Sequence, residues 1–306
     1  MLPVNLVKNS LKDLERSVLL TVFGDDEMHE MYEFVKKLKD LSNKIECEYV
    51  NVPERRLNLP AIKIHEIYFH AVPKYSELES FLFALKLVSK YDLKRDVEIV
   101  VTTFVSKLCP NCKATVDAIN KLTTKYGIEH HIVDIGMFPE FVEKYNISSV
   151  PTTIIGDMVF VGSMNVSEAE KWIKLAINQD YYEYIVEKLM RGEMDDVKRL
   201  AEARDIGRVL GKLVGHREFM VRLGAMATIE ALYEEKPEVG RKAKEEIIEL
   251  LNHDDDRIRE DAAMMLGMVG GKEDIENLKK LMAIGGRIGE SAKEAIENIK
   301  KGIKDG

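Results

Sequence analysis

The chain has 306 residues, of which 45% are apolar and 32% are charged, and its formal net charge at pH 7 is −8. This composition indicates a soluble globular chain, and the length predicts two or three domains. The acidic balance gives no reason to propose nucleic acid or an anionic membrane as a partner.

The N-terminal stretch contains Asp13 and Glu15 and lacks the apolar core of a signal peptide. No later apolar run approaches the roughly 18 residues that a membrane span needs. Three cysteines are too few for the disulfide framework of a small secreted domain. We therefore expect a cytoplasmic protein.

Helical and strand patterns alternate in the N-terminal part of the chain. The expected elements are, in chain order, a helix over 1–16, a strand at Val18–Phe23, a helix over about 28–42, a strand at Ile45–Val52, a hairpin from Leu59–Ile64 to Ile67–His70, and a helix from Ser76 to Ser89. Ser76 and Glu79 have the Ser-x-x-Glu spacing of a capping box, which predicts that Ser76 caps the last helix.

The same alternation follows from Val97 onwards. The expected elements are a strand at Val97–Val105, a helix that ends at Gly127, a strand at His131–Ile135, a helix around Phe138–Tyr145, a strand at Val150–Ile155, a turn at Gly156-Asp157, a strand at Met158–Val161, and a helix that opens at a second capping box, Ser167–Glu170. The first strand is an unbroken β-branched run, which is typical of a strand buried on both faces.

The two series have matching spacing, which indicates an internal duplication. Pro60 precedes Ser76 by 16 residues, and Pro151 precedes Ser167 by 16 residues. Both intervals contain a hairpin, so the sequence predicts two copies of a β-α-β-α-β-β-α module. The first copy has Asp25–Met28 near the place where the second has two cysteines, and it therefore contains no dithiol.

Cys109, Pro110, Asn111 and Cys112 lie where the buried strand leads into a helix. Pro110 suits the first helical position, because its missing N–H costs nothing there. Cys109 would then lie at the positive end of the helix, which favours the thiolate and makes Cys109 the nucleophile. Cys112, one turn later, can attack a mixed disulfide formed at Cys109. The pair is therefore predicted to exchange between dithiol and disulfide.

The alternative for this spacing is half of a structural zinc site, which needs four ligands. The only other cysteine is Cys47, and the adjacent His130 and His131 lack ligand spacing, so the redox interpretation is preferred and no metal is expected. Cys47 alternates with charged residues on a strand and shares its core-facing side with Ile45 and Tyr49. We expect Cys47 to be a buried, inert thiol and His130 to be a surface residue.

The cysteine motif after a buried strand, with Val150-Pro151-Thr152 ahead of a terminal hairpin and helix, is similar to thioredoxin and glutaredoxin. The tandem arrangement resembles the protein disulfide oxidoreductases of archaea and thermophilic bacteria, over roughly residues 10–178. This resemblance implies two thioredoxin-fold units, catalysis by Cys109 and Cys112, and Pro151 as a cis proline that faces the dithiol. It also implies that Pro110, Val150 and Pro151 bind the substrate, with Val150 offering backbone hydrogen bonds to a peptide.

The chain departs from the family pattern in two places. The first unit has no second dithiol, so we expect it to be structural or substrate-binding. Thr103 stands where thioredoxin buries an acidic residue, so the proton of Cys112 must pass to water or to another group. Asp134 is a candidate for that group, although capping a strand end is its more usual role. Lys107 either stabilises the Cys109 thiolate or is an ordinary exposed lysine.

After Gln179 the pattern contains helices only. Periods near 3.6 occur at Ile206–Val214, Phe219–Tyr233, Val239–Leu251, Ile258–Val269, Ile275–Met282 and Ile288–Ile299. Residues 220–225 match 257–262, with a weaker echo at 287–292, which resembles HEAT-type repeats whose paired helices stack into a solenoid. Asp254–Asp256 precede a helix without a calcium ligand ladder, so N-terminal capping is preferred.

The sequence thus predicts an α/β plus all-α protein with three domains: a thioredoxin-fold unit without a dithiol at 1–92, a redox-active unit at 93–179, and HEAT-like repeats at 180–306. The expected activity is thiol–disulfide oxidoreduction on protein disulfides by Cys109 and Cys112, without a cofactor. A thioredoxin-reductase-like donor would supply electrons, and the repeats would bind a protein partner. The alternative is a redox-sensing adaptor or scaffold that binds its partner through the repeats.

Overall fold

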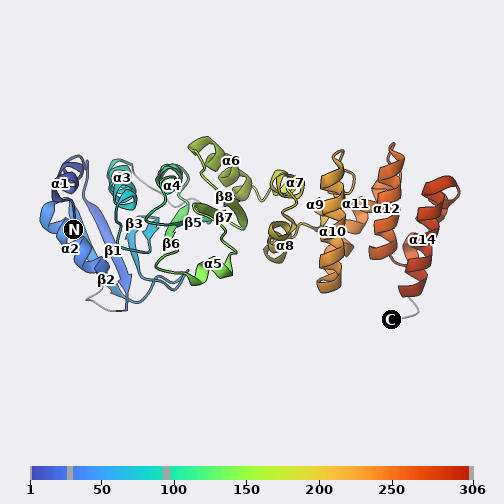
Figure 1. Cartoon of the computed structure of the whole chain (residues 1–306), viewed down its shortest axis with the longest axis horizontal. Helices are drawn as coiled ribbons and strands as arrows, with labels where there is room; N and C mark the ends of the chain where they lie inside the picture. Colours follow the sequence, from blue (N-terminus) through green and yellow to red (C-terminus); the bar gives the residue numbers. More distant parts are fainter. Residues whose placement is uncertain (1, 26–29, 92–96, 303–306) are drawn as a thin grey trace. The chain divides into compact units, whose positions relative to one another are not determined.

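The computed structural model describes residues 2–25, 30–91 and 97–302. The chain divides into two compact units, Met1–Gln179 and Asp180–Gly306 (Figure 1). The first unit contains every described strand, whereas the described elements of the second are all helical. None of the described helices is long and apolar enough to cross a membrane.

The first unit alternates helices and strands in the predicted order. Its elements are α1 (Val4–Lys12), β1 (Val18–Gly24), α2 (Glu30–Leu41), β2 (Ile45–Asn51), β3 (Ala61–Ile64), β4 (Ile67–Phe69), α3 (Ser76–Lys90), β5 (Val100–Val105), α4 (Cys112–Tyr126), β6 (Glu129–Asp134), α5 (Glu140–Lys144), β7 (Thr152–Ile155), β8 (Met158–Val161) and α6 (Val166–Ile177). The strand expected from Val97 begins later, at Val100, because Glu98 is exposed and burial starts at Val101.

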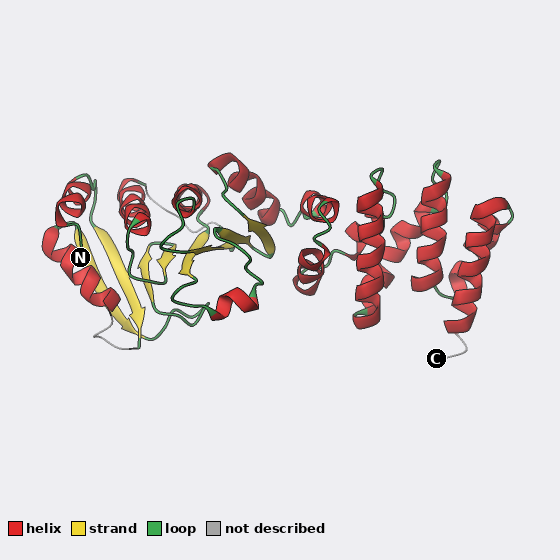
Figure 2. Ribbon diagram, viewed as in Figure 1, coloured by secondary structure: helices red, strands yellow, loops and turns green. Residues whose placement is uncertain are grey.

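The eight described strands form one sheet in the order β2-β1-β3-β4-β6-β5-β7-β8. Figure 2 draws the strands in yellow. β1 pairs in parallel with β2 and antiparallel with β3, and β3 pairs antiparallel with β4. The second half repeats these three pairings. β5 pairs in parallel with β6 and antiparallel with β7, and β7 pairs antiparallel with β8. The two halves are joined by the parallel pair of β4 and β6, in which Tyr68 lies opposite His131.

One apolar core extends across both halves of the sheet. Its buried side chains include Leu20 and Ile64 from the first half and Val105 and Ile132 from the second. Helix α3 contributes Phe81 to this core and packs against α4, the helix that follows the cysteine motif. The two halves are therefore packed as one compact unit with a shared interior.

Both predicted capping boxes are wrong about the residue that caps the helix. α3 begins at Ser76, so Ser76 already lies in the first turn, and Tyr75 holds the N-cap position with φ 52° and no side-chain bond. α6 begins at Val166, and its cap is Asn165, whose Oδ1 accepts a hydrogen bond from the Glu168 N–H at 3.0 Å. Asparagine caps a helix as well as serine does, and here it comes two residues earlier in the chain.

Two predicted chain reversals are confirmed. Gly127 follows α4 with φ 66°, and its N–H donates to the Thr123 carbonyl at 2.9 Å, which ends the helix in the left-handed conformation. Gly156 has φ 61° in the two-residue turn that sets Ile155 opposite Met158. Glycine adopts this backbone conformation without the cost that other residues have.

Cys47 differs from its prediction. β2 is an end strand of the sheet, so one of its edges has no neighbouring strand to cover it. The Cys47 side chain is partly exposed, packs against the apolar core and forms no disulfide. Ile45 on the same face is buried, and Tyr49 is half-buried. The thiol expected in the interior is therefore only partly covered.

The second unit is a series of helices. Its elements are α7 (Tyr182–Met190), α8 (Met194–Ala203), α9 (Gly207–Leu213), α10 (Phe219–Glu235), α11 (Pro237–Leu250), α12 (Asp256–Val269), a short 3₁₀ turn at Lys272–Asp274, α13 (Ile275–Met282) and α14 (Gly286–Gly302). All six predicted helical segments are present, and α7 and α8 precede them.

Helices two apart in this series approach closely. α9 packs on α11 and α12 packs on α14. A Cβ atom on Gly211 of α9 would lie 2.6 Å from the Ala243 carbonyl oxygen, and one on Gly267 of α12 would lie 2.7 Å from the Ala295 Cα. Each pair therefore depends on a glycine facing an alanine at the contact.

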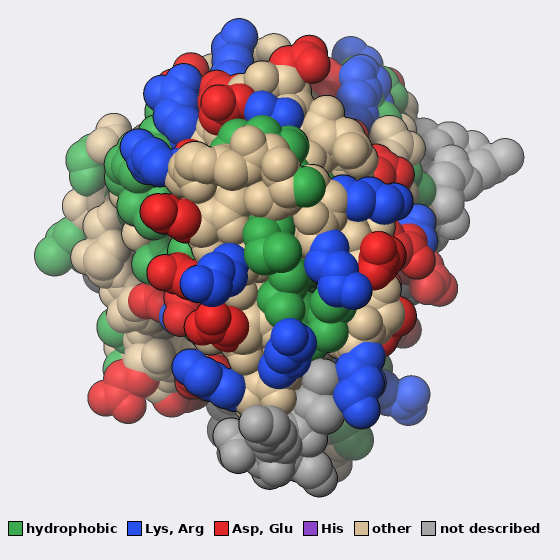
Figure 3. Space-filling model, turned by 90° about the vertical axis from the view of Figure 1, so that its right-hand side faces the viewer, with side chains coloured by type: hydrophobic (Ala, Val, Ile, Leu, Met, Phe, Trp, Pro, Cys, Tyr) green, Lys and Arg blue, Asp and Glu red, His purple; other side chains and the backbone are tan. Residues whose placement is uncertain are grey.

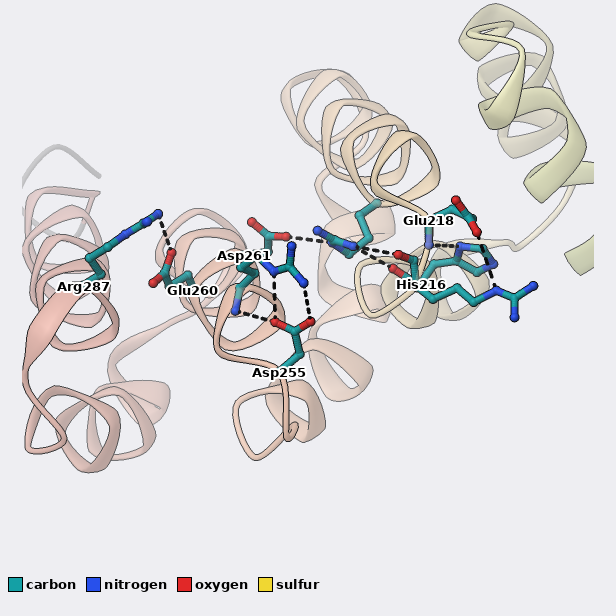
Figure 4. Close-up of polar contacts among 9 residues, drawn as sticks. His216, Glu218, Asp255, Glu260, Asp261 and Arg287 are labelled. Carbon is teal, nitrogen blue, oxygen red and sulfur yellow. Dashed lines mark hydrogen bonds and ion pairs between the residues drawn. The ribbon is translucent and has the colours of Figure 1, made fainter.

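Ion pairs link α10, α12 and α14 (Figure 4). Arg222 Nε lies 3.0 Å from Asp261 Oδ2, and Arg287 lies 3.0 Å from Glu260. Arg222 is buried, and it also donates to the His216 carbonyl at 3.1 Å. These additional bonds matter because a buried guanidinium is costly unless its donors are satisfied.

The acidic residue directly before α12 caps that helix. Asp255 Oδ1 accepts a hydrogen bond from the Arg257 N–H at 2.9 Å. The Arg257 guanidinium lies 3.1 Å from the other oxygen of the same carboxylate. The capping role predicted for this stretch is therefore confirmed at Asp255.

Candidate redox site

The cysteine pair lies between β5 and α4. The two Sγ atoms form a disulfide bond, and the two Cα atoms are 5.5 Å apart. Cys109 is 9% exposed and Cys112 is 3% exposed, so the cysteine that the sequence predicts as the nucleophile is the more accessible of the two. α4 begins at Cys112, with Asn111 in the N-cap position. The expectation that Pro110 starts the helix is therefore wrong.

A tight turn explains the later start of the helix. The Cys109 N–H donates to the Ser106 carbonyl at 2.9 Å, so the chain turns before Cys109 and the helical ladder follows only from Cys112. Cys109 still lies directly before the N-terminal end of α4. The partial positive charge of a helix N-terminus favours a thiolate at that place. Pro110 is exposed beside it.

The structure brings Val150 and Pro151 to Cys109. The Cys109 Sγ lies 3.6 Å from the Val150 carbonyl oxygen. The Val150–Pro151 peptide bond is cis, as the resemblance implied, and no other described peptide bond is cis. β7 starts at the next residue, Thr152, so the position of Pro151 is held by the sheet.

Glu77 on α3 is a site residue that the sequence analysis missed. It is 8% exposed and lines a cavity of about 10 Å³ together with Cys112, Ser80, Val105 and five other residues. Its Oε1 atom has no hydrogen-bond partner among the described residues. A buried carboxyl group in this state is uncommon, and this one lines the same small cavity as Cys112.

Burial raises the pKa of Glu77 from 4.5 to about 7, and the nearby Asp134 carboxylate adds to this effect. A backbone hydrogen bond at Lys74 and the charges of Lys107 and Lys74 oppose it. The group therefore changes its protonation near neutral pH, which is the range in which a side chain exchanges protons most effectively. Nothing local in the sequence marks Glu77, because helix packing alone brings α3 to Cys112.

Asp134 and Lys107 pair with each other. Asp134 is 2% exposed, and its Oδ2 lies 3.3 Å from Lys107 Nζ. Its Oδ1 accepts a hydrogen bond from the Gly136 N–H at 2.8 Å, so Asp134 ends β6 and holds the following turn. Lys107 is therefore engaged by a carboxylate and is not a freely exposed lysine.

Thr103 and His130 form a buried polar pair. The Thr103 Oγ1 lies 2.9 Å from His130 Nε2, and His130 Nδ1 lies 2.8 Å from Asn120 Oδ1. Both side chains are fully buried, and burial holds the pKa of His130 well below its usual value. The prediction of a surface histidine is wrong, because β6 lies inside the sheet between β4 and β5.

A second cluster outside the cysteine site has the composition of a metal site. Glu54, His70 and His131 are buried, and their potential ligand atoms lie within 4.8 Å of one another. The sequence analysis excluded a metal on the ground that His131 adjoins His130. It did not foresee that His70, from the other half of the sheet, would lie beside His131.

One family model matches the cysteine half of the sheet, and the other comparisons cover more than half of the chain. Residues 96–174 match a family model described as a thioredoxin domain. A protein named NADH dehydrogenase, from Ferdinandcohnia aciditolerans, is 30% identical in an alignment over 176 residues that covers 52% of this chain and 34% of that protein. The chain thus spans about a third of the length of this relative.

Two solved structures are similar to part of the chain. The N-terminal domain of the alkyl hydroperoxide reductase AhpF from Enterococcus faecalis has a TM-score of 0.49 and 21% identity, covering 56% of this chain and 97% of its own. A protein disulfide oxidoreductase from Aeropyrum pernix K1 has a TM-score of 0.47 and 17% identity, covering 57% of this chain and 92% of its own. On the family match, residues 96–174 are a thioredoxin-like domain, and a largely helical region follows it.

Proposed function

We propose that the chain is a thiol–disulfide oxidoreductase that acts on protein disulfides. The observation that carries this proposal is the Cys109–Cys112 pair at the start of α4, with the Val150 carbonyl 3.6 Å from the Cys109 Sγ. Exchange needs a nucleophilic thiolate, a second thiol within reach and a place for the substrate backbone. In this proposal Cys109 is the thiolate, Cys112 is the second thiol, and Val150 and Pro151 hold the substrate backbone.

The reaction proceeds in two balanced displacements. The Cys109 thiolate attacks one sulfur of the substrate disulfide, an S–S bond forms at Cys109, and the other substrate sulfur leaves as a thiolate. Cys112 then loses its proton and attacks the Cys109 Sγ. The second substrate thiolate leaves, and the Cys109–Cys112 disulfide remains, so the substrate has gained the two electrons that the dithiol lost.

The substrate strand lies along Val150 and Pro151. Val150 is half-buried beside the Cys109 thiol, and its backbone is available to hydrogen-bond an extended peptide. Pro110, which follows Cys109 in the chain, is exposed, and Leu108, which precedes Cys109, is 90% exposed. An apolar side chain this exposed beside a reactive thiol supports contact with a protein substrate.

Glu77 takes the proton of Cys112 in this proposal. The two residues line one small cavity, whose volume of about 10 Å³ is at the lower limit for a single relaying water. With a pKa of about 7, Glu77 is partly ionised at neutral pH and can accept a proton. The first half of the sheet, which has no dithiol, would then contribute to the chemistry through α3.

A nicotinamide-dependent reductase is the proposed source of electrons. The oxidised Cys109–Cys112 pair must receive two electrons before the next cycle, and a thioredoxin-reductase-like protein would deliver them. The relative named NADH dehydrogenase supports this choice. This chain corresponds to only a third of its length, so the NADH chemistry in its name would belong to the remaining two thirds.

The finer architecture is also a proposal. The repeated strand pairings support two thioredoxin-fold units, at 1–92 and 93–179, and the α9–α11 and α12–α14 contacts support HEAT-like repeats at 180–306. Phe219, Met220 and Leu223 are exposed on α10 and favour a protein-binding role for the repeats.

The face in Figure 3 mixes basic and acidic side chains and offers no single-sign field to a nucleic acid. A redox-sensing adaptor is the second candidate.

Trapping tests the assignment of roles. A Cys112→Ser chain, reduced and mixed with a disulfide-containing protein such as insulin, should stop at the mixed disulfide. Mass spectrometry of the peptides should place the adduct on Cys109, and Cys109→Ser should trap no substrate at all. An adduct on Cys47, or none in the Cys112→Ser chain, would disprove the proposed roles.

A further inference from the structure

A chain of buried polar groups crosses the junction of β4 and β6, outside the cysteine site. His70 Nδ1 lies 3.0 Å from the Pro60 carbonyl oxygen, and His70 Nε2 lies 2.8 Å from His131 Nδ1. His131 Nε2 lies 2.6 Å from Glu129 Oε1, which also accepts a hydrogen bond from Arg56 Nε at 2.8 Å. Both imidazole rings are fully buried. Each ring nitrogen must therefore find its partner inside the protein.

The outer partners determine which ring nitrogens carry hydrogen. A carbonyl oxygen only accepts, so His70 Nδ1 donates to Pro60. Glu129 Oε1 is paired with the guanidinium of Arg56, so it accepts from His131 Nε2 as well. A neutral imidazole has one N–H, and both rings have now used theirs. The two remaining nitrogens, His70 Nε2 and His131 Nδ1, direct lone pairs at each other across 2.8 Å. A positive species must lie between them.

Glu54 adds a third donor atom at this point. The potential ligand atoms of Glu54, His70 and His131 all lie within 4.8 Å of one another, and Glu54 is 7% exposed. Its two carboxylate oxygens accept hydrogen bonds from the N–H groups of Arg56 at 2.7 Å and Leu57 at 2.9 Å. These bonds hold the carboxylate in place.

We propose that His70 Nε2, His131 Nδ1 and a carboxylate oxygen of Glu54 bind a divalent first-row transition metal ion, for which zinc is the best match. Two imidazoles and one carboxylate are a common zinc ligand set, whereas calcium and magnesium prefer sites made of oxygen atoms alone. Binding would part the two nitrogens from 2.8 Å to about 3.3 Å, the separation that Zn–N bonds of about 2.0–2.1 Å produce in a tetrahedral site.

The surroundings of the three ligands have the organisation of a metal site. Histidines that bind a metal almost always donate their second N–H to a carbonyl or a carboxylate, which fixes the tautomer. His70 has the Pro60 carbonyl in this role, and His131 has Glu129. The ring of Tyr68 stacks on His131 with centroids 4.5 Å apart and holds the plane of the imidazole.

The metal would tie the two halves of the sheet together. His70 directly follows β4, His131 lies on β6, and Glu54 lies in the connection between β2 and β3. A ligand that binds only the folded chain stabilises it. This inference is independent of the proposed thiol chemistry, because no ligand belongs to the cysteine site.

Metal titration of the full-length chain tests the proposal. Cys47→Ser is used as the background, and the Cys109–Cys112 pair is kept oxidised, so that no thiolate is available to the metal. After treatment with a chelator, the protein is titrated with Zn²⁺ by calorimetry and with Co²⁺ by absorption spectroscopy. We expect one equivalent of each ion, Co²⁺ bands without sulfur charge transfer, and a rise in the melting temperature with Zn²⁺.

Variants assign the ligands. His70→Gln and Glu54→Gln, which lie on different segments, should each weaken Zn²⁺ binding more than about 100-fold, and Glu129→Gln should weaken it about 10- to 100-fold. His65→Asn, in the β3–β4 turn, is the matched control and should bind like the background. If His70→Gln fails to fold, the Zn²⁺ affinity of Glu54→Gln tests the proposal in its place. A folded background protein that binds neither ion would overturn the proposal and leave a shared proton, as in an imidazolium, between the rings. Equal binding by Glu54→Gln and His65→Asn would also overturn it.

Discussion

At the scale of single residues, the proposed chemistry depends on groups that come from distant parts of the chain. Thr103 occupies the strand position at which an acidic residue was expected from the family resemblance, and it bonds to His130 instead. The carboxyl group near Cys112 is supplied by Glu77 on α3. Spacing within a motif could not reveal this, because the contact is created by the packing of α3 on α4.

Glu77→Gln should slow the resolving step. The amide cannot accept a proton from Cys112, so we expect mixed-disulfide resolution to be about 10- to 100-fold slower at pH 8. In the unmodified chain the rate should rise with pH around the Glu77 pKa of about 7, and this inflection should be absent from the variant. Rapid-quench analysis of a mixed disulfide formed at Cys109 measures both.

Glu77→Gln should slow the resolving step but raise the stability of the folded chain at pH 8. The pKa of Glu77 is about 7 in the folded chain and 4.5 is its usual value, so the folded chain holds this proton more tightly. Stability therefore falls as pH rises from about 4.5 to about 7, by up to about 3 kcal/mol, and stays low above that range. Glu77→Gln should be more stable than the unmodified chain at pH 8 and similar to it at pH 4.5.

Glu79→Gln is the matched control for both measurements. Glu79 lies on the same helix but is exposed, 3.9 Å from Lys113. It should leave the rate and the pH inflection unchanged. If Glu79→Gln slows resolution as much as Glu77→Gln does, a general effect of charge on α3 explains the result and the specific role of Glu77 fails.

At the scale of helices and strands, the sequence predicted most of the order and type of the elements. Period-2 and period-3.6 patterns located the strands and helices because burial follows them directly. Helix starts were less predictable. Asn165 and Ser167 are both residues that commonly occupy an N-cap position, and only the backbone conformation of the folded chain determines which one does. Cys47 and His130 were misplaced because alternation shows which side of a strand faces the core, but not whether the strand is at the edge or the centre of the sheet.

Gly211→Ala should destabilise the second unit. The added methyl group would meet the Ala243 carbonyl oxygen at 2.6 Å, so α9 and α11 must separate. Overpacking of this kind costs about 1–3 kcal/mol, which exceeds the roughly 1 kcal/mol that alanine gains over glycine in a helix. Urea unfolding measures the loss.

Lys212→Ala on the same helix provides the control. Its side chain is 60% exposed and lies only at the limit of contact, 4.0 Å, from Glu246. The change in stability should stay within about 0.5 kcal/mol. If Gly211→Ala is as stable as Lys212→Ala, the close helix contact is not a source of stability.

At the scale of the whole molecule, a thioredoxin-like domain is joined to a helical unit. The two halves of the first unit share one sheet, and the junction of β4 and β6 contains the buried histidines. The sequence predicted the duplication from the spacing of Pro60 and Pro151. It could not predict that the copies would pair edge to edge through β4 and β6, because the pattern within one copy does not show which strand of the other copy will pair with it.

The proposed roles of the two units differ. The first would perform disulfide exchange, and the helical unit would bring a protein partner to it. Attachment of a binding unit raises the effective concentration of its partner without changing the chemical step. An adaptor would use the same parts in another way, since its cysteine pair would oxidise once and change the affinity of the repeats. Turnover separates the two functions.

The most direct measurement is therefore the multiple-turnover reduction of a protein disulfide, with insulin as substrate and limiting dithiothreitol as electron donor. We expect the full-length chain to complete many cycles, Cys109→Ser to lose at least about 100-fold in rate, and Cys47→Ser to retain the rate within about twofold. A chain that reacts once and then stops, or a Cys109→Ser variant that retains its turnover while Cys47→Ser loses it, would contradict the assignment of this protein as a thiol–disulfide oxidoreductase.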